Sequence, residues 1–298
     1  MRLTECLPVT LLMTCQLYLP IPIMNSFLTA VFLSRAFCVS VRSSGNVLAA
    51  IWLLVLMFLP AIHVSASTQN FAILSHYQHP PYVTSTSDGL TFELANYLTR
   101  KSGGRYRFQS QILPKRRLLN LLRSNTEDAL VPWVTPEWMP EAISLRPDWS
   151  DTIMESNDLV ISSQQKPLEW QGPVSASGLR FGGILGHVYT DLMTAFAQGT
   201  IIRDDAPDDE SNLMKLRKQR IDFLFLQDHA VQYYLHRHPA LMADLYISKS
   251  KRNSKPHQLK IMLRVRNEAD KSAILLIINR MPQDAEWQSI LKRYGLGI

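Results

Sequence analysis

The sequence predicts an α/β fold of two lobes for residues 67–298. Short apolar runs alternate with stretches of helical periodicity, and the alternation occurs in two series that begin at Phe71 and at Leu179. An extended segment follows each series, at 159–163 and at 257–265, which indicates that the chain passes between the lobes twice. Each lobe then has close to the usual size of a domain, about 100 residues.

The first series predicts the first lobe, residues 67–157. Its second element has leucines at 90, 94 and 98 on one helical face, and the pair Gly103-Gly104 is a typical helix end. In chain order the series predicts strand 71–77, helix 90–102, strand 106–112, a helix that opens at Pro114, and strand 129–134.

The second series predicts the second lobe, residues 158–258, and the last 40 residues (259–298) are expected to return to the first lobe. Its elements are strand 180–185, helix 188–198, strand 200–203, helix 211–220, strand 222–226, helix 229–236 and strand 245–248. The extended run 257–265 and helices 268–280 and 285–294 close the chain.

The segment 1–66 is typical of an export signal and not of a fold. Residues 47–62 are uncharged and apolar, Arg42 precedes them, and Val64-Ser65-Ala66 has the small-x-small pattern of a cleavage site. We therefore expect the mature protein to begin near Ser67. We expect translation to begin downstream of Met1, with Met24 as the start, which gives a long but ordinary signal peptide; a retained N-terminal membrane anchor is the alternative.

Composition excludes several function classes. The chain has 298 residues, is 46% hydrophobic and carries a net charge of +6. Its three cysteines all lie before residue 67, so the remaining 232 residues form no disulfide, thiolate nucleophile or Cys-ligated metal site. That part has 28 basic and 24 acidic residues, too small an excess to indicate nucleic-acid binding. The histidine spacings match no metal-ligand set, and we expect neither metal nor cofactor.

Several short motifs carry a family resemblance across residues 70–298. In order they are His79-Pro80-Pro81-Tyr82, Asp88-Gly89-Leu90, Phe92-Glu93-Leu94-Ala95, Leu113-Pro114-Lys115-Arg116-Arg117, Asp128-Ala129-Leu130-Val131, Thr135-Pro136-Glu137, Gly186-His187-Val188-Tyr189-Thr190-Asp191-Leu192 and Arg220-Ile221-Asp222-Phe223 with Asp228. Together they resemble the bacterial extracellular solute-binding proteins of family 3, which are type II periplasmic binding proteins and commonly serve polar amino-acid ABC importers.

The resemblance implies a monomeric periplasmic receptor that captures a small polar solute, an amino acid or a related compound, between its lobes. An ABC permease in the inner membrane would be its partner. Ligands of open α/β sheets lie at the carboxyl ends of strands. Here those ends carry Tyr82, Trp133, His187 and Asp228.

Three aromatic residues are predicted to contact the ligand from the first lobe. Tyr82 is where the family places an aromatic ring over the ligand, although it could also cover the lobe's rim. Trp133 and Trp138 lie among Pro132, Pro136 and Pro140, which favours a surface loop over core packing.

Trp138 departs from the family pattern. Amino-acid receptors commonly place an arginine there to bind the ligand carboxylate through two hydrogen bonds. Arg117 is a candidate replacement, with a solvated arginine on the first turn of a helix as the alternative.

The second lobe contributes His187 and Asp228. Gly186-His187-Val188 precedes the predicted helix 188–198, and a helix N-terminus favours an anion. Asp228 is the family's acceptor for a ligand ammonium, and it could also cap the following helix.

Two other functions remain open at the level of sequence. Cyclohexadienyl dehydratase resembles these receptors, and such an enzyme would need a general acid, for which Asp228 and Glu137 are candidates. A sensory module would need a separate membrane partner.

Overall fold

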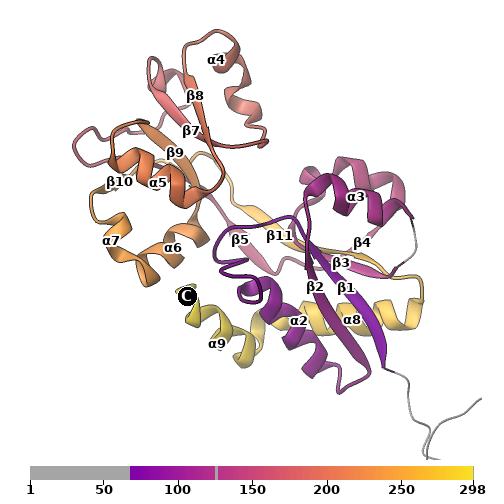
Figure 1. The fold of residues 1–298 in the computed structure, drawn as a ribbon. Helices are drawn as coiled ribbons and strands as arrows, with labels where there is room; N and C mark the ends of the chain where they lie inside the picture. Colours follow the sequence, from indigo (N-terminus) through magenta and orange to yellow (C-terminus); the bar gives the residue numbers. More distant parts are fainter. Residues whose placement is uncertain (1–67, 125–126, 298) are drawn as a thin grey trace, which may run out of the picture. The chain divides into compact units, whose positions relative to one another are not determined.

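The computed structural model describes residues 68–124 and 127–297, all of which belong to one compact unit. The predictions for residues 1–66 concern a part of the chain outside this description. The described residues form two sheets that carry helices on both faces (Figure 1). None of their helices combines the length and the hydropathy that crossing a membrane requires.

The first sheet has the strand order β2-β1-β3-β11-β4, and β5 pairs with the other end of β11. β1 is parallel to β2 and β3, whereas β11 is antiparallel to its partners. The strands are β1 (Gln69–Ser75), β2 (Tyr106–Ile112), β3 (Ala129–Val134), β4 (Asp148–Trp149), β5 (Met154–Ser156) and β11 (His257–Arg264), and the helices of this first lobe are α2 (Leu90–Lys101), α3 (Lys115–Ser124), α8 (Glu268–Arg280) and α9 (Ala285–Arg293).

Strand β1 is buried on both faces because helices cover both sides of the sheet (Figure 1). Phe71 and Ile73 pack in one apolar cluster with residues of α2, α8 and α9. Ala72 and Leu74 point the other way and pack with the leucines of α3. The period of two along the strand thus divides the core between the two helical layers.

The second sheet has the order β10-β6-β9-β7-β8, with β7 parallel to β8 and β9 and with β6 antiparallel to β9. Its strands are β6 (Asp158–Ser163), β7 (Arg180–Ile184), β8 (Ile202–Ala206), β9 (Phe223–Gln227) and β10 (Leu245–Ile247), and the helices of this second lobe are α4 (Met193–Ala197), α5 (Asp209–Arg217), α6 (Asp228–Arg237) and α7 (Pro239–Met242). Phe181, Phe223 and Phe225 pack with residues of α4 on one face, whereas Leu224 and Leu226 belong to the cluster that contains α5 and α6.

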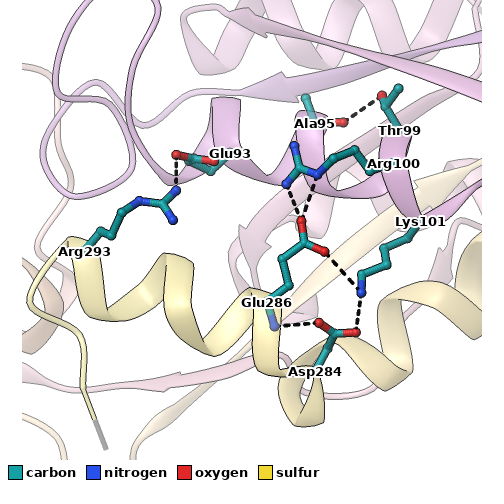
Figure 2. Close-up of polar contacts among 8 residues, drawn as sticks. All are labelled: Glu93, Ala95, Thr99, Arg100, Lys101, Asp284, Glu286 and Arg293. Carbon is teal, nitrogen blue, oxygen red and sulfur yellow. Dashed lines mark hydrogen bonds and ion pairs between the residues drawn. The ribbon is translucent and has the colours of Figure 1, made fainter.

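The C-terminal helix α9 is attached to α2 by ion pairs (Figure 2). Arg100 Nη2 lies 2.6 Å from Glu286 Oε1, Lys101 Nζ lies 2.7 Å from Asp284 Oδ2, and Arg293 Nη2 lies 2.5 Å from Glu93 Oε1. Asp284 also caps α9 by accepting from the Glu286 amide. These contacts join the end of the chain to the first lobe.

The helix predicted over residues 188–198 is wrong in its first half. The structure has a 3-10 turn at Thr190–Leu192 and then the five-residue α4. Arg203 donates to the carbonyls of Ile184 and His187, and the Tyr189 hydroxyl accepts from the Ile184 amide. These bonds hold the backbone in a turn and delay the helix, so the prediction of an anion site at a helix N-terminus beside His187 loses its basis.

Candidate functional site

The segment that follows β1 places Tyr82 at the carboxyl end of the first sheet. The carbonyls of Pro81 and Tyr82 accept from the Leu90 and Thr91 amides at the start of α2. Gly89 permits this close approach, because its φ is +126° and a Cβ atom there would lie 2.5 Å from the Tyr82 carbonyl oxygen. The start of α2 therefore fixes the position of the Tyr82 backbone.

The Tyr82 side chain is fully buried and connects the two lobes. Its hydroxyl lies 3.1 Å from His229 Nδ1 on α6, and its ring lies 5.3 Å from the ring of Trp133. Burial raises the pKa of Tyr82 well above its ordinary value, so the hydroxyl that shares this hydrogen bond with the imidazole stays protonated.

Trp133 does not lie in a surface loop, contrary to the expectation from its neighbouring prolines. It is the fifth residue of β3, it is fully buried, and its Nε1 donates to Thr91 Oγ1 at 3.1 Å. Its ring stacks on Trp287 of α9 with 6.3 Å between centroids. Tyr82 and Trp133 are therefore brought together within the core.

Asp228 is the first residue of α6, and its carboxylate is engaged by the connection between the lobes. Oδ1 accepts from Ser156 Oγ at 3.1 Å and from the His229 amide at 2.9 Å, and Oδ2 accepts from the Asn157 amide at 3.0 Å. The Asp228 amide donates to the Asn157 carbonyl. The capping residue of α6 is Gln227, so Asp228 fastens the β5–β6 connection to α6 and does not cap the helix.

A second group of polar residues surrounds Tyr77, directly after β1. The centre of the Tyr77 ring lies 4.6 Å from that of His76, 5.3 Å from that of His79 and 4.8 Å from that of Tyr82, and the Gln227 side chain is near its hydroxyl. Burial, with the nearby Lys115, His79 and His187, lowers the pKa of His76 to about 4. The imidazole of His76 is therefore neutral at pH 7.

The sequence pattern does not mark His76, Tyr77 and Gln227 as ligand contacts. It predicts a strand that ends at Tyr77, whereas β1 ends at Ser75. Gln227 ends β9 directly before Asp228. The rule that ligands lie at strand ends would have found all three residues if the strand boundaries had been known to within two residues.

On the second lobe, His187 lies near an arginine that binds two carboxylates. Arg252 donates to both oxygens of Asp191 and, at 2.8 Å, to Asp158 Oδ2, and its guanidinium lies 4.3 Å from the centre of the Phe225 ring. Burial and the Arg252 charge lower the pKa of His187. His187 itself packs on the ring of Tyr189.

Trp138 and Arg117 lie elsewhere on the first lobe. The Trp138 ring contacts His257 of β11 edge-on at 4.7 Å, and its carbonyl accepts from Lys115 Nζ at 2.8 Å. Arg117 is exposed on the first turn of α3. Neither is in ring contact or hydrogen-bonded with Tyr82 or Trp133 in the described part of the chain. Residues 68–124 and 127–297 hold no cluster of ligating side chains suited to a metal ion.

The arrangement of the two sheets is shared with solved solute-binding proteins. A Salmonella typhimurium periplasmic binding protein described for its high arginine specificity aligns with a TM-score of 0.55 at 16% identity, over 76% of this chain and 99% of its own. An amino acid ABC transporter substrate-binding protein from Streptococcus pneumoniae, bound to L-arginine, gives 0.57 at 14% identity, over 76% and 94%. The GluR0 ligand-binding core with L-glutamate gives 0.56 at 12%, over 77% and 99%.

The described residues have the type II periplasmic-binding-protein fold. No protein-family model matches the sequence, and a search of curated proteins found no match. At identities of 12–16% the likeness establishes the fold alone. What this fold does here must be argued from the residues at the ends of its strands.

Proposed function

We propose that the exported part of this chain is a periplasmic receptor that binds a small polar solute between its lobes for an ABC importer. The observation that carries the proposal is that strand-end side chains of both lobes meet around Tyr77 and Tyr82, with Tyr82 in hydrogen-bond contact with His229. In α/β sheets these strand ends are where ligands bind.

Export and partners belong to the same proposal. The segment 1–66 acts as the signal, the mature chain starts near Ser67, and the receptor is a monomer that presents its solute to a permease. N-terminal sequencing of the exported protein tests the first part: a start near Ser67 supports it, and an intact residue 1 contradicts it.

A thermal-shift screen tests the receptor itself. The protein purified from the periplasm is mixed with amino acids, polyamines, sugars and small acids, and a true ligand raises Tm because it binds the folded state alone. At a concentration of 100 Kd the stabilisation is about 2.7 kcal/mol. Consumption of a prephenate-like acid without any saturable shift would contradict the receptor and favour a dehydratase.

The site residues are part of this proposal. Tyr82, Trp133, Trp138, Arg117, His187 and Asp228 are the positions predicted to contact the solute, and His76, Tyr77 and Gln227 join them. Tyr77 is preferred to Trp133 as the ring that touches the solute, because Trp133 is fully buried and its indole N–H already has a partner.

A further inference from the structure

Three arginines on the outer face of α3 form a cationic surface on the first lobe. The leucines of this helix pack towards the first sheet, so Arg116, Arg117 and Arg123 are exposed on the opposite side (Figure 1). Arg123 donates to Asn120 Oδ1 at 3.5 Å, which leaves its charge without a counterion. Within residues 68–124 and 127–297, none of the three arginines forms an ion pair.

Strand β2 adds a fourth arginine to this surface. Arg107 is exposed, pairs in register with Asn70 of β1 and forms no ion pair with a described residue. Asn70 lies two residues before Ala72, which packs with the leucines of α3, so Arg107 points to the side of the sheet that α3 covers. The name arginine face is used below for Arg107, Arg116, Arg117 and Arg123.

The acidic groups near the arginine face leave most of its charge without a counterion. Glu141 Oε2 lies 3.9 Å from Lys115 Nζ, and Asp128 Oδ1 lies 2.8 Å from Arg266 Nε, so both acids already have a cationic partner. Glu127, which is exposed just beyond α3, has no ion pair among the described residues. Four arginines against this one carboxylate leave a net charge of +3, whereas residues 67–298 together carry +4, from 28 basic and 24 acidic residues.

An exposed apolar side chain lies on the segment beside α3. The 3-10 segment Pro140–Leu145 packs against this helix, because Met139 and Ala142 belong to the same apolar cluster as the leucines of α3. Ile143 of the segment is nevertheless 63% exposed. Guanidinium groups bind phosphates through paired hydrogen bonds, and an apolar side chain next to them can enter the boundary between headgroups and acyl chains. This combination favours a lipid surface over an acidic protein surface.

We propose that the arginine face docks the exported protein on an anionic bilayer surface. The phosphate groups of anionic lipids act as the counterions that the four arginines lack within the described part of the protein. Each arginine near such a surface strengthens binding about fivefold, and the attraction falls off within a Debye length. The inference concerns the first lobe alone and does not depend on which solute the receptor captures.

Co-sedimentation of the exported protein with sucrose-loaded vesicles at pH 7 tests the proposal. One preparation contains equal parts of phosphatidylglycerol and phosphatidylcholine, and the other contains phosphatidylcholine alone. In about 20 mM NaCl we expect partitioning onto the anionic vesicles to be at least about tenfold stronger than onto the neutral ones, and about 500 mM NaCl should abolish it because salt screens the arginine charges. Equal binding to both preparations overturns the proposal. Absence of binding to the anionic vesicles also overturns it and indicates an acidic protein as the partner.

Two matched double variants test the surface itself. Arg116→Gln with Arg123→Gln removes two charges from the arginine face, whereas Arg220→Gln with Arg280→Gln removes two exposed charges from the second lobe and from the end of α8. We expect the first variant to weaken partitioning about 25-fold and the second less than about threefold. Circular dichroism checks that both variants fold. An equal loss in the two variants would mean that net charge alone attracts the protein, which overturns the assignment of this face.

The result is separable from the receptor function. Neither double variant changes a residue that is proposed to contact the solute, so both should give the same thermal shift with a true ligand as the unchanged protein. A failed vesicle experiment therefore leaves the receptor proposal intact, and a failed ligand screen leaves the bilayer proposal intact.

Discussion

The aromatic and imidazole rings between the lobes perform different tasks according to their exposure. Tyr82 and Trp133 are fully buried and act as core residues, whereas Tyr77 and His76 are half-buried, and the buried Nδ1 of His76 has no hydrogen-bond partner among the described residues. The core role of Trp133 changes what its replacement measures. A substitution of Trp133 therefore tests the stability of the fold first and binding of the solute only second.

Trp133→Ala is expected to lower the free energy of unfolding by about 3–5 kcal/mol, because it leaves a large cavity and an unpaired Thr91 hydroxyl. Trp138→Ala is the matched control, since its ring is only partly buried and should cost clearly less. Urea denaturation measures both values. Equal losses would place Trp133 outside the core.

His76 should make stability depend on pH. Its pKa is 6.5 in the unfolded chain and about 4 in the folded state, so the unfolded chain binds the proton more readily between these values. The contribution of His76 is therefore fully present above pH 6.5 and is lost as pH falls towards 4, by at most about 3 kcal/mol. Urea denaturation across this range, compared with His76→Gln, isolates that contribution. If the free energy of unfolding depends on pH in the same way in the wild type and in His76→Gln, the pH dependence does not come from His76.

At the scale of elements, most boundaries could be predicted and the loops could not. Strands 106–112 and 129–134 and helix 268–280 agree with the structure at both ends, because alternating or helical apolar patterns end there at turn residues or at charged residues. The start of α4 depends on Arg203, which lies on β8 and bonds to backbone carbonyls of residues 184 and 187. The apolar periodicity of residues 188–198 cannot indicate a hydrogen-bond donor that lies on another strand.

The turn before α2 provides a test at this scale. Gly89→Ala should destabilise the protein by more than about 2 kcal/mol, because φ is +126° and the new Cβ would meet backbone atoms. Gly103→Ala is the matched control: its φ is also positive, at +61°, but nothing lies within 4 Å of its Cβ position. Chemical denaturation should rank the first variant well below the second. A similar loss in both would mean that steric contact at Gly89 is unimportant.

For the whole molecule, the two-sheet fold could be predicted from the repeated alternation of strands and helices, whereas the contacts between the lobes could not. The Tyr82–His229 hydrogen bond joins residues 147 positions apart, and nothing in either local sequence indicates the other. The hydrogen bonds from Ser156 and Asn157 to the Asp228 carboxylate also cannot be predicted from the sequence around Asp228. These contacts depend on how two separately predicted lobes are joined.

A double-mutant cycle measures the coupling between the lobes. Tyr82→Phe and His229→Gln should each destabilise the protein, and the double variant should lose about 1 kcal/mol less than the sum, because one hydrogen bond is removed in either case. The free energies come from urea denaturation at pH 7. Strict additivity would show that the two side chains do not interact in solution.

The stacked pair Trp133–Trp287 also has an optical consequence. Both indoles are shielded from water, and Tyr82 lies between Trp133 and the imidazole of His229. Any rearrangement of Tyr82 that accompanies solute capture changes the surroundings of an intrinsic fluorophore. If the proposed solute capture shifts Tyr82, we expect tryptophan fluorescence to report occupancy without an attached dye.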